Sequence, residues 1–199
     1  NEPGVLIIST PSSPLVKRDA LSIDGTMFKV NDLFFNTPAR LKYLKSDRAE
    51  ISSIIDVIEK FAISYPEIAF ELAIDNKVIL KTNGRGNILE CITKIYGIYV
   101  NSLYEIKNDS LNFSFKGYIG KPDINYSTKN KIVTFLNRRY IYSFPMTKGI
   151  IDAFSDYLAP IRYPLCVLDI SIDSALVDVN VHPSKKQVRI SIEDEIVSK

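Results

Sequence analysis

The sequence predicts an α+β fold in which strands and helices are mixed along the chain, with two layers of secondary structure in each part. Short runs rich in β-branched and aromatic residues, such as 5–10 and 111–119, have the composition of strands. Residues 51–62 instead repeat apolar side chains at the spacing of an amphipathic helix. With 46 % hydrophobic residues, 10 Phe and 11 Tyr, the 199-residue chain has enough apolar surface for a globular core.

The N-terminal quarter of the chain predicts two strands followed by a helix. Residues 5–10 and 26–35 have strand composition and are joined by a polar Pro/Ser connection. In the sequence NTPARLKYLKS that follows, Thr37 can cap a helix, and Pro38 suits its first turn, where the missing N–H costs nothing.

A longer helix and a hairpin are expected next. Asp47 followed by Glu50 resembles a capping box, and the apolar periodicity after it ends near 65–66. Residues 68–74 and 77–82 then predict a hairpin around Asp75–Asn76.

The polar, glycine-bearing stretch 82–87 is the best candidate for a domain boundary. A new helix starts there, with Asn87 as its cap, Glu90 three residues later and Gly97 as its end. Beyond it we expect strands at 103–107, 111–119, 131–136, 140–142, 165–172 and 176–181, and a helix at about 146–158.

Several classes of protein are disfavoured by the composition. Cys91 and Cys166 are too few for a disulfide framework and are expected to be free, buried thiols. The chain lacks an apolar run of the roughly 18 residues that would span a bilayer, and it starts without a signal peptide or an initiator Met, as the interior of a longer chain would. With His182 as its single histidine and no Walker motif, it predicts no complete active site, no catalytic residue and no metal ligand.

Positive charge is concentrated between residues 116 and 148. Seven cations lie in this basic stretch against one acid, Asp123, a local balance of +6 in a chain whose net charge is +2. The cations are Lys116, Lys121, Lys129, Lys131, Arg138, Arg139 and Lys148. Such a stretch suits contact with nucleic-acid phosphates, although a solvated surface would have the same composition.

A second candidate for binding phosphate is the segment VDVNVHPSKKQVRIS, 177–191. A β-run ends at His182–Pro183, and Lys185 follows at the turn. A lysine at a loop tip carries a point charge with three donors several ångströms from its backbone. By composition alone the turn could equally be solvated.

Three segments stand out along the chain: GTMFKVNDLFFNTPARLKYLKS (25–46), FLNRRYI (135–141) and VDVNVHPSKKQVRIS (177–191). Together, and in this order, they resemble the MutL family of DNA mismatch repair proteins. The resemblance implies that residues 1–82 are the C-terminal half of a GHKL-type α/β sandwich, the ATPase fold shared with gyrase. It implies that residues 83–199 are a transducer domain, a ribosomal-protein-like βαβ fold.

The resemblance also assigns roles to particular residues. Gly25 and Thr26 match a motif beside the bound nucleotide, and Lys185 matches the lysine that reaches the γ-phosphate from the second domain. Arg139 matches the arginine of the family's DNA-contacting strand. Arg138 replaces the usual glycine and adds a cation beside it, so both arginines are expected to bind DNA.

The same resemblance implies ATP and Mg as cofactors, bound mainly by a half of the site that lies N-terminal to residue 1. That half would supply the general base and the metal ligand, so residues 1–199 alone are not expected to hydrolyse ATP. Implied partners are DNA, a mismatch-recognition protein of the MutS type and a second subunit in a homo- or heterodimer, with no membrane. The protein would be cytoplasmic, at the nucleoid, if bacterial, and nuclear if eukaryotic.

The function that the sequence predicts is therefore mismatch repair, with ATP binding coupled to domain closure and DNA contact. Because only one arrangement of the domains would bring Lys185 to the γ-phosphate, ATP would favour the closed form. Two alternatives remain. A gyrase-like topoisomerase segment would also use a second-domain lysine, although Asn36–Arg40 argues against it. A plain nucleic-acid-binding module would give Lys185 no role.

Overall fold

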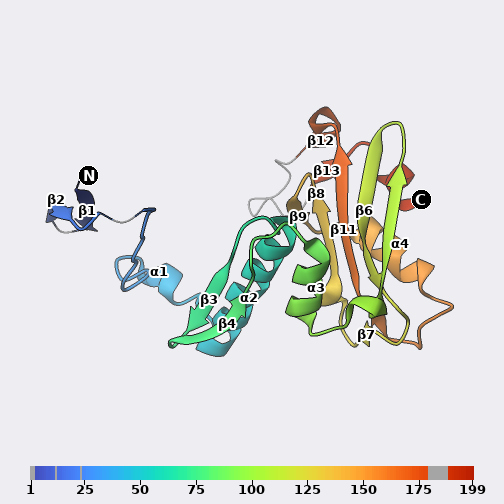
Figure 1. The fold of residues 1–199 in the computed structure, drawn as a ribbon, viewed down its shortest axis with the longest axis horizontal. Coiled ribbons are helices and arrows are strands. Elements are labelled where there is room, and N and C mark those ends of the chain that lie inside the picture. Colours follow the sequence, from blue (N-terminus) through green and yellow to red (C-terminus); the bar gives the residue numbers. More distant parts are fainter. Residues whose placement is uncertain (1–2, 12, 23, 179–187) are drawn as a thin grey trace. The chain divides into compact units, whose positions relative to one another are not determined.

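The computed structural model describes residues 3–11, 13–22, 24–178 and 188–199. The chain divides into two compact units, Asn1–Ile51 and Ser52–Lys199 (Figure 1). The domain boundary that we predict at 82/83 is a different division, based on motifs, and it stays a prediction. Among the described residues, no helix combines the length and apolar character needed to cross a membrane.

The first unit contains an antiparallel pair of strands, β1 (Gly4–Thr10) and β2 (Ser13–Ala20). The strand predicted at 5–10 is confirmed. The strand predicted at 26–35 is wrong, because a strand needs a ladder partner and β1 pairs with β2, a segment the sequence had assigned to a connection. Asp32 (φ 49°) and Phe34 (φ 68°) instead turn the chain through the left-handed region.

Two helices follow, α1 (Pro38–Leu41) and α2 (Asp47–Ser64). Pro38 is in the first turn of α1 as predicted, but the Thr37 hydroxyl makes no capping hydrogen bond, and the helix is only four residues long. Glu50 accepts a hydrogen bond from the backbone N–H of Lys45 at 2.9 Å, so it satisfies a donor before the helix and not that of Asp47. The end of α2 agrees with the prediction.

In the second unit, β3 (Glu71–Ile74) and β4 (Lys77–Lys81) form the predicted hairpin. Asp75 and Asn76 at its turn have φ values of 48° and 62°. Two consecutive positive values define a type I′ turn, whose twist matches that of the strands it joins.

Helix α3 (Ile88–Tyr96) begins and ends where its capping residues predict. The Asn87 side chain accepts a hydrogen bond from the Glu90 N–H at 3.0 Å. Gly97 terminates the helix in the left-handed conformation, with φ 65°.

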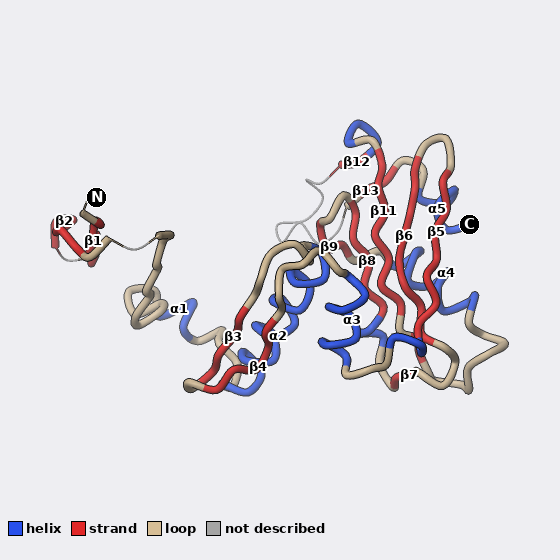
Figure 2. Tube along the Cα trace, viewed as in Figure 1, coloured by secondary structure: helices blue, strands red, loops and turns tan. Residues whose placement is uncertain are grey.

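The centre of the second unit is a five-stranded sheet in the order β5-β6-β11-β8-β9, drawn in red in Figure 2. Strand β11 runs parallel to β8 and antiparallel to β6, and helix α4 lies between β9 and β11 in the chain, as in a βαβ crossover. The bounds are β5 Leu103–Asp109, β6 Phe113–Gly120, β8 Ile132–Leu136, β9 Arg139–Ile141, α4 Phe144–Ala153 and β11 Cys166–Ile172. The strands predicted at 103–107, 111–119, 131–136, 140–142 and 165–172 are confirmed, whereas only Val177–Asp178 of the strand predicted at 176–181 is described as a strand and 179–181 lie outside the described residues. Helix α4 begins earlier than predicted because Ser143 caps it by accepting from the Met146 N–H at 3.1 Å, and it also ends earlier, at Ala153.

Helices cover both faces of this sheet, so this unit has three layers and not the two that we expected. On one face, side chains such as Ile132 and Ile170 pack against α4 and α5 (Glu193–Val197). On the other face, Phe135 and Val167 pack against Ile63 of α2 and Ile92 of α3. The reason is that β8 and β11 are apolar on both faces, as strands buried on both sides are. The mixed α+β class is confirmed.

Short elements complete the second unit. They are β7 Asn125–Tyr126, β10 Tyr163–Pro164, β12 Val177–Asp178, β13 Arg189–Ile190 and the 3₁₀ turns Val100–Ser102, Lys129–Lys131 and Ser174–Leu176. Cys91 and Cys166 are free and buried, as predicted. The predicted turn that carries His182 and Lys185 lies outside the described residues.

Candidate nucleic-acid interface

The turn between β8 and β9 presents both arginines that the sequence assigns to DNA. Leu136 pairs with Arg139 across the hairpin, so Asn137 and Arg138 form a two-residue turn. Their φ values of 49° and 67° make it a type I′ turn. Asn tolerates this left-handed conformation, but an arginine adopts it only at a cost, so other contacts must hold Arg138 in place.

Asn137 fastens the turn to β11. Its backbone N–H donates to the carbonyl oxygen of Ile170 at 2.8 Å. Its Nδ2 donates to the carbonyl oxygen of Ile172 at 2.9 Å, and its Oδ1 accepts from the Ile172 N–H at 3.0 Å. The sequence analysis assigned no role to Asn137 itself. The Asn-x-Arg motif that contains this residue is the feature that could have indicated one.

Arg138 fastens the same turn to the C-terminal end of α2. Its Nε and Nη2 donate to the carbonyl oxygen of Ser64 at 3.0 and 2.9 Å, and its guanidinium pairs with Glu67. The guanidinium carbon lies 4.4 Å from the ring centroid of Tyr65. A cation at a helix C-terminus is favourable because the last carbonyl groups are unpaired and carry partial negative charge.

These contacts occupy the side chain of Arg138 within the chain. The hydrogen bond from Arg138 also lowers the pKa of the Glu67 carboxyl below its usual range, so this carboxyl is ionised at neutral pH. The expectation that Arg138 binds DNA remains untested, but the structure shows what else it does.

Arg139 is different. It is the first residue of β9, its side chain is exposed, and within the described residues that side chain has neither a hydrogen bond nor an ion pair. Strand pairing with Leu136 fixes its backbone, while its guanidinium remains available to an external acceptor. A planar fork of donors on a fixed backbone is well suited to a phosphate.

The other cations of the basic stretch lie beside partners in the chain. Lys148 pairs with Asp152 at 2.7 Å. The remaining contacts are Lys131 over the Tyr96 ring (4.3 Å), Lys129 over Tyr163 (5.5 Å), Lys121 over Tyr104 (5.6 Å) and Lys116 in register with Asp169 on the adjacent strand. The +6 balance of this stretch therefore overstates the charge that is free to meet a ligand.

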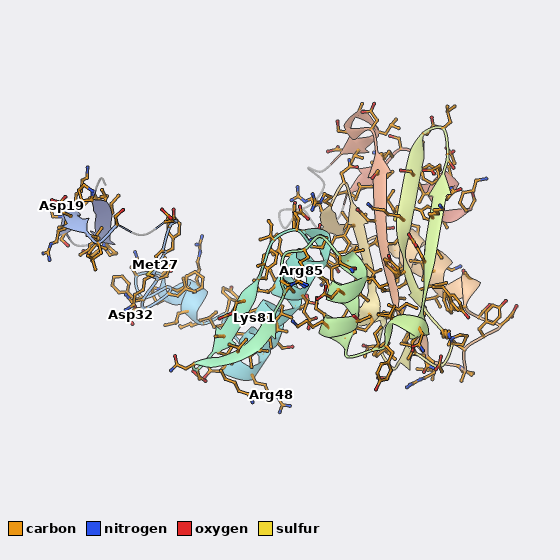
Figure 3. All side chains as sticks on the ribbon, in the orientation of Figure 1. Asp19, Met27, Asp32, Arg48, Lys81 and Arg85 are labelled. Atoms are coloured by element: carbon orange, nitrogen blue, oxygen red, sulfur yellow. The ribbon has the colours of Figure 1, made fainter. Side chains whose placement is uncertain are left out.

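Another exposed cation, Arg85, lies outside the basic stretch, in the loop between β4 and α3 (Figure 3). Its backbone N–H donates to Oδ1 of Asn83 at 3.2 Å, and the flanking Gly84 and Gly86 have positive φ. The sequence reading did not single out Arg85.

Of the residues expected near the nucleotide, Gly25 and Thr26 lie in the first unit, and Lys185 lies outside the described residues. Gly25 has φ 112°, which favours glycine, and both Gly25 and Thr26 are exposed. No described atom outside its neighbours lies within 4 Å of where a Cβ on Gly25 would stand. Lys185 is not among the described residues, so the structure does not test whether the three residues meet. No group of three His, Cys, Asp or Glu side chains in the described ranges could hold a metal ion.

Two solved structures define the class of fold. One, described as the N terminal domain of a DNA repair protein, matches with a TM-score of 0.73 at 20 % identity, covering 94 % of this chain and 61 % of that one. The other, the Aquifex aeolicus MutL ATPase domain complexed with ADP, matches with a TM-score of 0.64 at 21 % identity, covering 80 % and 57 %. The chain has the fold of a part of each of these two domains.

The sequence comparisons identify the family. Residues 92–199 match the family described as DNA mismatch repair protein, C-terminal domain. DNA mismatch repair protein MutL of Streptococcus mutans is 42 % identical over 197 residues, which are 98 % of this chain and 30 % of that protein. The MutL of Lactobacillus acidophilus is 42 % identical over 181 residues, 90 % and 29 %. This chain belongs to the MutL family of DNA mismatch repair proteins, and it spans less than a third of the length of these relatives.

Proposed function

We propose that this chain couples ATP binding to domain closure and DNA contact in a mismatch repair protein. One observation carries the DNA part of the proposal: the Arg139 side chain is exposed and without a partner among the described residues, directly after a turn that is fastened on two sides. A cation held in this way contacts a phosphate without first losing backbone freedom. Such a contact depends on the phosphate and not on the base, so binding would be independent of sequence.

The nucleotide part of the proposal is carried by family membership and by the motifs. Lys185 would reach the γ-phosphate, and the chain at Gly25–Thr26 would lie beside the nucleotide. The exposed glycine at φ 112° fits close approach of a ligand to the backbone. ATP would supply the γ-phosphate charge that Lys185 neutralises. The described residues hold no cluster suited to magnesium, and the proposal gives them no part in binding it.

The strength of such a switch follows from the contact itself. A charge-assisted hydrogen bond contributes about 1.5–3 kcal/mol. If only the closed arrangement supplies Lys185, this difference shifts the equilibrium between open and closed forms by roughly 10- to 100-fold. A MutS-type partner, a dimeric assembly and a cytoplasmic location at the nucleoid are proposed on the same family grounds, since the relatives named above are bacterial.

Lysine substitutions in the full-length protein test the coupling. We expect a non-hydrolysable ATP analogue to change the DNA affinity of the parent and of Lys186→Ala, but not that of Lys185→Ala. Lys186 is the matched control because it is the neighbouring lysine, with the same side chain and charge, and the motif assigns the contact to Lys185. The coupling is refuted if Lys185→Ala responds to the analogue as the parent does. If the DNA affinity of the parent protein does not change when the ATP analogue is added, a plain nucleic-acid-binding module is favoured instead.

A further inference from the structure

A cavity of about 460 Å³ lies between α2 and the β8–β9 hairpin. Its lining includes Lys60, Phe61, Tyr65, Arg138, Arg139 and Tyr140. All of these residues belong to the compact unit 52–199. The volume falls within the range of about 300–1,000 Å³ typical of small-molecule sites.

Among the described residues, four aromatic rings line the cavity: the buried Phe135, and Phe61, Tyr65 and Tyr140. Two of them, Tyr65 and Tyr140, already have cations over them. Arg138 lies 4.4 Å from the centroid of Tyr65, and the Lys60 ammonium lies 3.9 Å from that of Tyr140. Phe61 has only a tilted contact with Tyr65, at 6.4 Å between centroids, and it is 49 % exposed. Phe61 is thus an apolar ring surface open to a ligand.

The charges around this ring favour an anion. Among the described residues, Lys60, Arg138 and Arg139 line the cavity together with a single acid, Asp56. Lys60 is bound to Asp56 at 2.6 Å, and Arg138 is bound at the end of α2, so Arg139 provides the cation that a ligand would meet. An aromatic surface beside a free cation matches a nucleotide, with the base on the ring and the phosphate on the guanidinium.

We propose that this cavity binds an unstacked nucleotide of single-stranded DNA, with its base against Phe61 and its phosphate at Arg139. The inference rests on the proposed DNA contact of Arg139 and adds the kind of DNA. A duplex keeps its bases stacked on one another, so their faces are not free to meet Phe61. Single-stranded DNA presents those faces, and any base can stack, so the site would select for strand state and not for sequence.

Substitution of Phe61 in the full-length protein tests the proposal. The probes are an oligothymidylate of about 16 nucleotides, the upper end of single-module site sizes, and a duplex of matching length. A stacked base contributes about 1–3 kcal/mol, so Phe61→Ala should weaken single-strand binding roughly 5- to 150-fold and leave duplex binding unchanged. Since no charge is altered, the salt dependence should stay that of the parent.

Two further variants serve as controls. Phe61→Trp keeps a stacking ring and should retain single-strand affinity. Tyr99→Ala removes an exposed aromatic (80 % exposed) that does not line the cavity and should change nothing. Circular dichroism should show that each variant remains folded.

The outcomes separate this inference from the proposed function. If Arg139→Glu weakens DNA binding but Phe61→Ala binds single strands like the parent, the base site is refuted and the DNA contact stands. Equal losses for single strands and duplex in Phe61→Ala would also overturn the base site. If Arg139→Glu has no effect on either probe, the proposed function fails and this inference fails with it.

Discussion

Replacement of Asn137 by alanine should loosen the turn that carries the proposed DNA contact. The change removes two hydrogen bonds to Ile172, at 2.9 and 3.0 Å, which contribute about 0.5–1.5 kcal/mol each. It also puts alanine at φ 49°, a left-handed conformation that costs about 1–2 kcal/mol. The combined loss of local stability is expected to be about 2–5 kcal/mol.

Glycine at the same position separates the two causes. Asn137→Gly loses the side-chain hydrogen bonds but accepts the positive φ, so it should cost about 1–3 kcal/mol and less than alanine. Native-state hydrogen exchange on the full-length protein measures the loss directly. The amides to follow are those of Ile172, which donates to Oδ1 of Asn137, and of Asn137 itself, which donates to Ile170.

Two results would refute this reasoning. If alanine and glycine lower the protection equally, the left-handed backbone is not a constraint at this turn. If neither variant lowers the protection of the Ile172 amide, the hydrogen bonds seen in the structure do not fasten the turn to β11.

Three more predictions concern the core of the second unit. Burial raises the pKa of the Cys166 thiol to about 12 and also raises that of Cys91, so neither should react with a thiol reagent at neutral pH until the protein unfolds, as rates in native and denatured protein would show. Burial also raises the pKa of the Asp169 carboxyl above 3.8 in the folded protein. The uncharged carboxyl therefore favours folding below pH 3.8, and this contribution is lost as the pH rises through the raised pKa. Asp169→Asn should accordingly stabilise the fold in urea titrations at neutral pH and not at about pH 3. In Gly117→Ala the added Cβ would lie 2.1 Å from the carbonyl oxygen of Val167, so β6 and β11 must separate, and the melting temperature should drop by an amount equivalent to about 1–3 kcal/mol or more.

Local chemistry explains the elements that the sequence predicted well. The cap at Asn87 and the left-handed Gly97 delimit α3 wherever that segment lies in the fold, because both act through bonds within a few residues. The Asp75–Asn76 turn is equally local. The motif around Asn137 lies on a β-hairpin, as the strands predicted on either side of it required.

The features that the sequence missed depend on partners far away in the chain. Residues 26–35 have the composition of a strand but do not form one, because strand formation depends on pairing with another strand and β1 pairs with β2. Arg138 meets Ser64 and Glu67 across more than 70 residues, so its charge could not be separated from that of Arg139 by composition. The cavity beside Phe61 arises only when α2 packs next to the hairpin.

The salt dependence of DNA binding by Arg139→Glu tests the central claim most directly. Each phosphate contact contributes about 0.9 to the slope of log K against log salt on duplex DNA. We expect Arg139→Glu in the full-length protein to bind more weakly to all sequences alike, with a slope shallower by about 1. Lys107→Glu is the matched control, since Lys107 is an exposed cation on β5, at the opposite edge of the same sheet, and should keep the parent's affinity and slope. A parental affinity and slope for Arg139→Glu, or an equal loss for Lys107→Glu, would contradict the assignment of Arg139 to the DNA contact.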